Sequence, residues 1–110
     1  MRTYPLRNKQ GQVCAFEIER LLVGSRMLSK LLRSSPDVTE IKVRRLFQRP
    51  LDIHAEFRFK GQPFIVWEPY GDNSRYWIGP KDWSVAESID LSSVEHVFKS
   101  YSRLRRSQEK

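Results

Sequence analysis

Residues 53–60 alternate strictly between apolar and polar side chains, and this period of two constrains the fold more than any other feature. The apolar set is Ile53, Ala55, Phe57 and Phe59, and the polar set is His54, Glu56, Arg58 and Lys60. A half-buried strand has this period because successive side chains point to opposite faces of a sheet. Gly61 follows directly and accepts the positive φ of a tight turn. The segment is therefore predicted to be a strand of an antiparallel sheet with one solvated face.

Neighbouring segments extend this strand to a four-stranded meander. Strands are expected over residues 37–47, 53–60, 63–68 and 75–78, with turns at 48–52, 60–62 and 70–74. Such short connections favour antiparallel order. Residues 3–6 and 12–16 are two weaker strand patterns around the turn-like Asn8–Gly11. They are either an N-terminal hairpin, which we favour, or an irregular arm.

Two segments follow the helical period instead. The first is residues 17–33, with a stripe of Ile18, Leu21, Leu22, Ser25, Leu28 and Leu32, and the second begins at Ser92, where Ser92 and Glu95 form a capping-box pattern. The expected fold is α+β, an antiparallel four-stranded meander, possibly extended by an N-terminal hairpin, with two helices packed on one face. A chain of 110 residues is expected to form a single domain over residues 1–106, with residues 107–110 as a frayed C-terminal tail.

Positive charge is concentrated on the two predicted helices of this chain, whose net charge is +7. Each helix carries three basic residues at positions i, i+4 and i+7: Arg26, Lys30 and Arg33 on the first, and Lys99, Arg103 and Arg106 on the second. Both triplets are predicted to be exposed basic ridges. They are candidates for contacts with nucleic-acid phosphates, and the alternative is an ordinary solvated helix face.

Large aromatic residues are crowded between positions 67 and 83. The set comprises Trp67, Tyr70, Tyr76, Trp77 and Trp83. Core packing accounts for most of them, and Trp67 is expected to be a buried residue. A core of this size is too small for the whole set, so the remainder is predicted to form an exposed apolar patch of the kind that binds proteins. A stacking platform for bases is less favoured, because acidic residues surround these aromatics.

Catalytic and metal-binding patterns were sought and none was found. His54 and Glu56 are interpreted as a surface pair on one strand face, and Cys14 as a small core residue. We expect no cofactor and no metal, and an enzyme is the least favoured class. One cysteine, no signal-peptide pattern and no long apolar run together predict a cytoplasmic protein without a membrane span.

The sequence therefore predicts a small, non-catalytic cytoplasmic interaction protein. It would engage a protein partner or its own copy through the aromatic 67–83 region or a sheet edge. The alternative is a nucleic-acid-binding protein that contacts phosphates with the basic ridges of its two helices.

Overall fold

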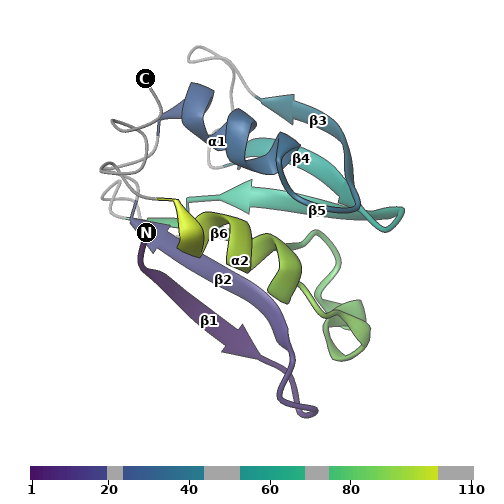
Figure 1. Ribbon diagram of the computed structural model, residues 1–110. Helices are drawn as coiled ribbons and strands as arrows, with labels where there is room; N and C mark the ends of the chain where they lie inside the picture. The colour runs from purple at the N-terminus through teal and green to yellow at the C-terminus, as the bar shows by residue number, and fades with distance from the viewer. Residues whose placement is uncertain (20–23, 44–52, 69–74, 102–110) are drawn as a thin grey trace.

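An antiparallel sheet forms the framework of the protein in the computed structural model, which describes residues 1–19, 24–43, 53–68 and 75–101 (Figure 1). Within these ranges the chain forms six strands, two α-helices and one 3-10 helix. In chain order they are β1 (Thr3–Arg7), β2 (Val13–Glu19), α1 (Ser25–Arg33), β3 (Val38–Val43), β4 (Ile53–Phe59), β5 (Gln62–Trp67), β6 (Arg75–Pro80), η2 (Trp83–Ser88) and α2 (Ser92–Ser100).

The sheet is larger than the four-stranded meander expected from the sequence. Its strand order is β1-β2-β6-β5-β4-β3, and every neighbouring pair is antiparallel. The predicted meander is present as β3 to β6. The N-terminal hairpin forms β1 and β2, and β2 joins the meander by pairing with β6, so that Phe16 lies opposite Ile78. The chain is an α+β protein with a six-stranded sheet, and β1 and β3 are its edges.

The helix predicted over residues 17–33 is wrong at its beginning. Ile18 belongs to β2, where it lies between Thr3 of β1 and Tyr76 of β6 and is fully buried. Ladder hydrogen bonds to two strands override the local helical pattern at this residue. The α-helix begins only at Ser25, and Gly24, expected inside it, is the extended residue before its first turn. Positions 20–23 of that prediction lie outside the described residues.

The predicted capping box of α2 is also wrong. The Ser92 hydroxyl and backbone N–H both donate to Oδ1 of Asp90, so an aspartate two residues upstream satisfies the first N–H of the helix. These bonds lower the pKa of the Asp90 carboxyl. Glu95 instead accepts a hydrogen bond of 2.7 Å from the hydroxyl of Thr3 on β1. Its carboxylate therefore ties the helix to the edge of the sheet.

The hydrophobic core lies between the helices and one face of the sheet. Both α-helices lie on the same side of the strands (Figure 1). The largest fully buried side chains come from every layer: Phe16, Ile18, Phe64, Val66 and Ile78 from the strands, and Leu28, Leu32, Val94 and Phe98 from the helices. Phe16 and Phe98 meet edge to face with ring centroids 5.4 Å apart. Within the described chain, neither α-helix packs on the opposite face of the sheet.

Several other expectations concern residues outside the described ranges. They include the end of the third predicted strand beyond Val43, the turns at 48–52 and 70–74, and the tail at 107–110. Among the described residues, no helix has the length and apolarity that a membrane crossing requires.

Candidate binding surfaces

Three tryptophans form a continuous row on the sheet face opposite the helices. Trp67 of β5 lies directly opposite Trp77 of β6, with ring centroids 5.8 Å apart in an edge-to-face arrangement. Trp83 of η2 contacts Trp77 at the same centroid distance. Trp67 is 36% exposed and Trp83 53% exposed, whereas Trp77 between them is half-buried. We call this surface, with Trp67, Trp77 and Trp83 at its centre, the tryptophan face.

Gly79 of β6 leaves the space that the indole ring of Trp77 occupies. A Cβ built at Gly79 would lie 2.6 Å from Cη2 of Trp77 and 2.8 Å from Cβ of Ala15. The indole ring therefore lies over the glycine, in space that any other residue would fill. Because Ala15 and Gly79 are both small, the ring can lie flat across two strands and still remain in contact with its two tryptophan neighbours.

Charged residues around the tryptophan face are arranged in pairs of opposite sign. Arg75 lies 2.9 Å from Glu17, Arg58 lies 3.2 Å from Glu40, and Lys81 lies 3.6 Å from Glu56. The guanidinium of Arg75 also stacks 3.8 Å above the ring of Tyr4. The Tyr4 hydroxyl donates to Glu19 at 2.7 Å, and this bond raises the pKa of the phenol. The surface is apolar at its centre, with balanced charge at its rim.

The five predicted aromatic site residues therefore separate into distinct environments. Trp67, Trp77 and Trp83 come together on the open face, whereas Tyr76 is only 3% exposed and belongs to the core on the opposite side of β6. The expectation that Trp67 is buried is wrong, because the helices cover only one face of the sheet. Tyr70 lies outside the described residues. Tyr4 was missed, although its place in an alternating N-terminal strand was a usable signal.

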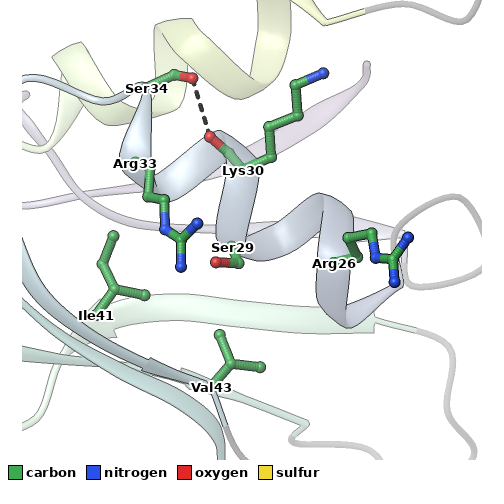
Figure 2. Close-up of a pocket in the computed structure, with 7 residues that line it drawn as sticks. All are labelled: Arg26, Ser29, Lys30, Arg33, Ser34, Ile41 and Val43. Carbon is green, nitrogen blue, oxygen red and sulfur yellow. Dashed lines mark hydrogen bonds between the residues drawn. The ribbon is translucent and has the colours of Figure 1, made fainter.

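The basic ridge predicted on the first helix borders a groove between α1 and β3. Arg26, Lys30 and Arg33 are all exposed. Together with Ser29 and Ser34 of the helix and Ile41 and Val43 of β3, they line a cavity of about 660 Å³ (Figure 2). On the second helix Lys99 is exposed, whereas Arg103 and Arg106 lie outside the described residues. The sequence did not predict that Ile41 and Val43 line this groove, because only the fold places β3 beside α1.

His54 does not form the surface pair with Glu56 that the alternation predicts. Ile53 pairs with Trp67 and Ala55 pairs with Val66, so His54 is the extra residue of a β-bulge. The bulge turns its ring to the helix side, where Nε2 lies 2.8 Å from Oε1 of Glu68 and the ring meets Tyr76 edge to face. Among the described residues, no group of three His, Cys, Asp or Glu residues is placed to hold a metal ion.

Cys14 is buried in the core, as the sequence predicts, with 1% of its surface exposed. Burial raises the pKa of its thiol, so the unreactive protonated form is favoured at neutral pH. We expect a disulfide reagent at pH 8 to modify the folded protein at least ~100-fold more slowly than the urea-unfolded protein, because reaction requires opening of the core. Thiolate release followed by absorbance measures both rates, and a Cys14→Ser variant supplies the blank. Labelling of the folded protein at the unfolded rate would contradict this burial.

Comparisons with family models, with curated proteins and with solved structures each find no match to this chain. Function is therefore inferred from two surfaces, the tryptophan face and the groove beside α1.

Proposed function

We propose that this is a non-catalytic interaction protein that binds a second copy of itself through the tryptophan face. The observation that carries the proposal is the row of Trp67, Trp77 and Trp83, two of which expose a third or more of their surface. Interface centres are enriched in tryptophan and depleted in charge, with a polar rim around them. The tryptophan face has this composition, since its ion pairs surround the aromatic row.

The charge of the chain favours this face for contact between identical copies. Two molecules that each carry +7 repel one another over most of their surface. On the tryptophan face, Arg75, Arg58 and Lys81 are each matched by a glutamate within 4 Å. A two-fold contact here brings together two surfaces of balanced charge. It also lets one sheet pack on the other at about 10 Å, the usual spacing in β-sandwiches.

The size of the face indicates a weak dimer. Six strands at a spacing of about 4.8 Å give a width of roughly 29 Å, and strands of five to seven residues have a length of about 20 Å. The face therefore offers roughly 600 Å² per copy, or about 1,200 Å² in total, at the lower limit of stable interfaces. We expect a dissociation constant on the order of 10 μM, because tight binding at this area is confined to the best-packed interfaces.

Sedimentation equilibrium between ~1 and ~200 μM tests the proposal. The wild-type chain is expected to pass from monomer to dimer, with a blue shift of tryptophan emission as the indoles leave water. The double variant Trp67→Ala/Trp83→Ala is expected to weaken the dimer at least ~30-fold, the loss of about 2 kcal/mol that defines a hot spot. A matched control, Gln10→Ala/His96→Ala, changes two exposed residues away from this face and is expected to dimerise normally.

Two results would contradict self-docking. One is a wild-type chain that stays monomeric at ~200 μM, which would leave the tryptophan face to a partner of another kind. The other is a dimer that the two tryptophan substitutions leave intact while the circular dichroism spectrum remains native. The contact would then lie elsewhere, with the β1 or β3 edge of the sheet as the next place to examine.

A further inference from the structure

The groove between α1 and β3 combines two kinds of wall. Arg26, Ser29, Lys30 and Arg33 fall at i, i+3, i+4 and i+7 on one face of the helix. Ile41 and Val43, half-buried on the edge strand, form the apolar side. Figure 2 shows the Arg33 guanidinium and the Ser29 hydroxyl directed toward these two side chains, with Arg26 at the other end of the helix and the Lys30 side chain extending away from the apolar wall.

Among the described residues, no carboxylate forms an ion pair with the cations of this groove. The ion pairs in which both partners are described residues are His54–Glu68, Arg58–Glu40, Arg75–Glu17 and Lys81–Glu56, and none involves a residue of α1. The described residues that line the groove carry three positive charges and no negative charge. Unpaired cations gathered on one side of a protein attract polyanions and speed their association. By contrast, Arg58, Arg75 and Lys81 beside the tryptophan face each have a glutamate partner.

The spacing of the cations indicates an extended anion. Arg26 and Arg33 are seven residues apart on the helix, or about 10.5 Å along its axis. Two guanidinium groups so far apart do not converge on one isolated phosphate, whereas a chain of phosphates can contact both. The apolar wall adds a second requirement, because Ile41 and Val43 offer nothing to a purely ionic ligand. A nucleic-acid strand meets both conditions, since phosphates alternate with sugars and bases along its length.

We propose that the α1–β3 groove binds the sugar–phosphate backbone of nucleic acid. Arg26, Lys30 and Arg33 contact successive phosphates, and the sugars lie against Ile41 and Val43. The contacts carry no base readout, so binding is independent of sequence. This site lies on the helix side of the sheet, away from the tryptophan face, and does not depend on self-docking. The sequence predicts phosphate contacts by basic ridges on both helices, and this proposal assigns them to the ridge on α1.

Fluorescence anisotropy with labelled 20-nucleotide single strands and 20-base-pair duplexes, in DNA and RNA form, tests the site at ~50 and ~200 mM salt. We expect micromolar binding at low salt, and a log–log salt slope of roughly −2 to −3 for three phosphate contacts. The variant Arg26→Gln/Lys30→Gln/Arg33→Gln is expected to lose at least ~30-fold in affinity at low salt. Its slope is expected to fall toward zero.

A second triple variant controls for net charge. Arg2→Gln/Arg7→Gln/Lys9→Gln removes the same three charges from exposed positions in and beside the β1–β2 hairpin. It is expected to lose no more than ~3-fold in affinity and to keep the wild-type slope. Circular dichroism melts confirm that both variants fold. A Gln triplet that leaves affinity unchanged, or an equal loss in both variants, would overturn the groove as the binding site.

Competition separates nucleic acid from other anions. Polyglutamate of the same charge as the labelled strand, and inorganic phosphate at ~10 mM, are expected to displace the strand weakly, because neither places sugars on Ile41 and Val43. Displacement by polyglutamate as effective as that by unlabelled strand would overturn the assignment to nucleic acid. No binding by the wild-type chain at ~50 mM salt would also overturn it. Self-docking is measured without nucleic acid and is not affected by either result.

Discussion

Replacement of Asn8 by alanine is expected to lower the free energy of unfolding by about 3–5 kcal/mol, although the residue lies in a hairpin loop. Its side chain is 8% exposed and satisfies buried backbone groups on two segments. The amide nitrogen donates to the carbonyls of Ala86 and Ile89 at 3.1 Å each. The amide oxygen accepts from the backbone N–H groups of Gln10 and Gln12 at 3.0 Å each.

Alanine would remove the side-chain partner of all four backbone groups, and of these the Ala86 carbonyl keeps its bond from the Ile89 N–H. Each buried group that stays unsatisfied costs about 1–3 kcal/mol, and water reaches some of them at the loop surface. Asn8→Asp keeps the acceptor but sets a carboxylate against two carbonyls, so we expect it to be at least as destabilising as alanine. Lys9→Ala is the matched control, because Lys9 is exposed and only its backbone N–H bonds to Glu87.

Urea unfolding followed by circular dichroism measures these differences. A protein concentration of ~1 μM keeps dimer formation from contributing to stability. If Asn8→Ala unfolds within 1 kcal/mol of the wild-type chain, the loop is not fastened to residues 86–89 through this side chain. The fastening would then come from the backbone bond of 2.6 Å between the Leu91 N–H and the Val13 carbonyl.

The strands of the meander could be predicted from the sequence because their signals are local. The alternation over 55–60 and the glycine at 61 agree with β4 and with the turn, where Lys60 and Gly61 both have positive φ. The secondary structure of residues 17–19 could not be predicted from local signals. Ile18 fits a helical stripe as well as a strand, and its pairing with Tyr76, far along the chain, decides between them.

Features that depend on one extra residue or on the placement of a whole element could not be predicted. The bulge at His54 places His54 on the helix side and sets Ile53 opposite Trp67, so Ile53 and His54 both lie on the face opposite to the one that the alternation predicts. The exposure of Trp67 depends on where the helices pack. Its strand is apolar on both faces, and the predicted packing of both helices on one face does not show which face of the strand they cover. The basic wall of the groove beside α1 was predicted, because its cations share one helical face. The apolar wall was not, because it belongs to β3.

The two faces of β5 are expected to differ sharply in what they contribute to stability. Phe64 is fully buried and meets Phe57 and Phe59 at centroid distances of 5.5 and 5.6 Å. Phe64→Ala leaves a cavity in the core and is expected to cost about 3–5 kcal/mol. Trp67→Ala, three residues along the same strand, is expected to cost only about 1–2 kcal/mol. It loses partly solvated surface and one edge-to-face contact with Trp77.

This comparison also tests the basis of the proposed function, because both variants lie in one strand and are measured in the same urea experiment at ~1 μM protein. A cost for Trp67→Ala close to that for Phe64→Ala would mean that something covers the indole in the monomer. The tryptophan face would then be an internal packing surface, and self-docking would lose its physical reason. A small cost at ~1 μM that grows when the experiment is repeated at ~200 μM is the opposite result. It would show that the ring becomes buried only when a second copy is present, because only a bound partner makes stability depend on concentration.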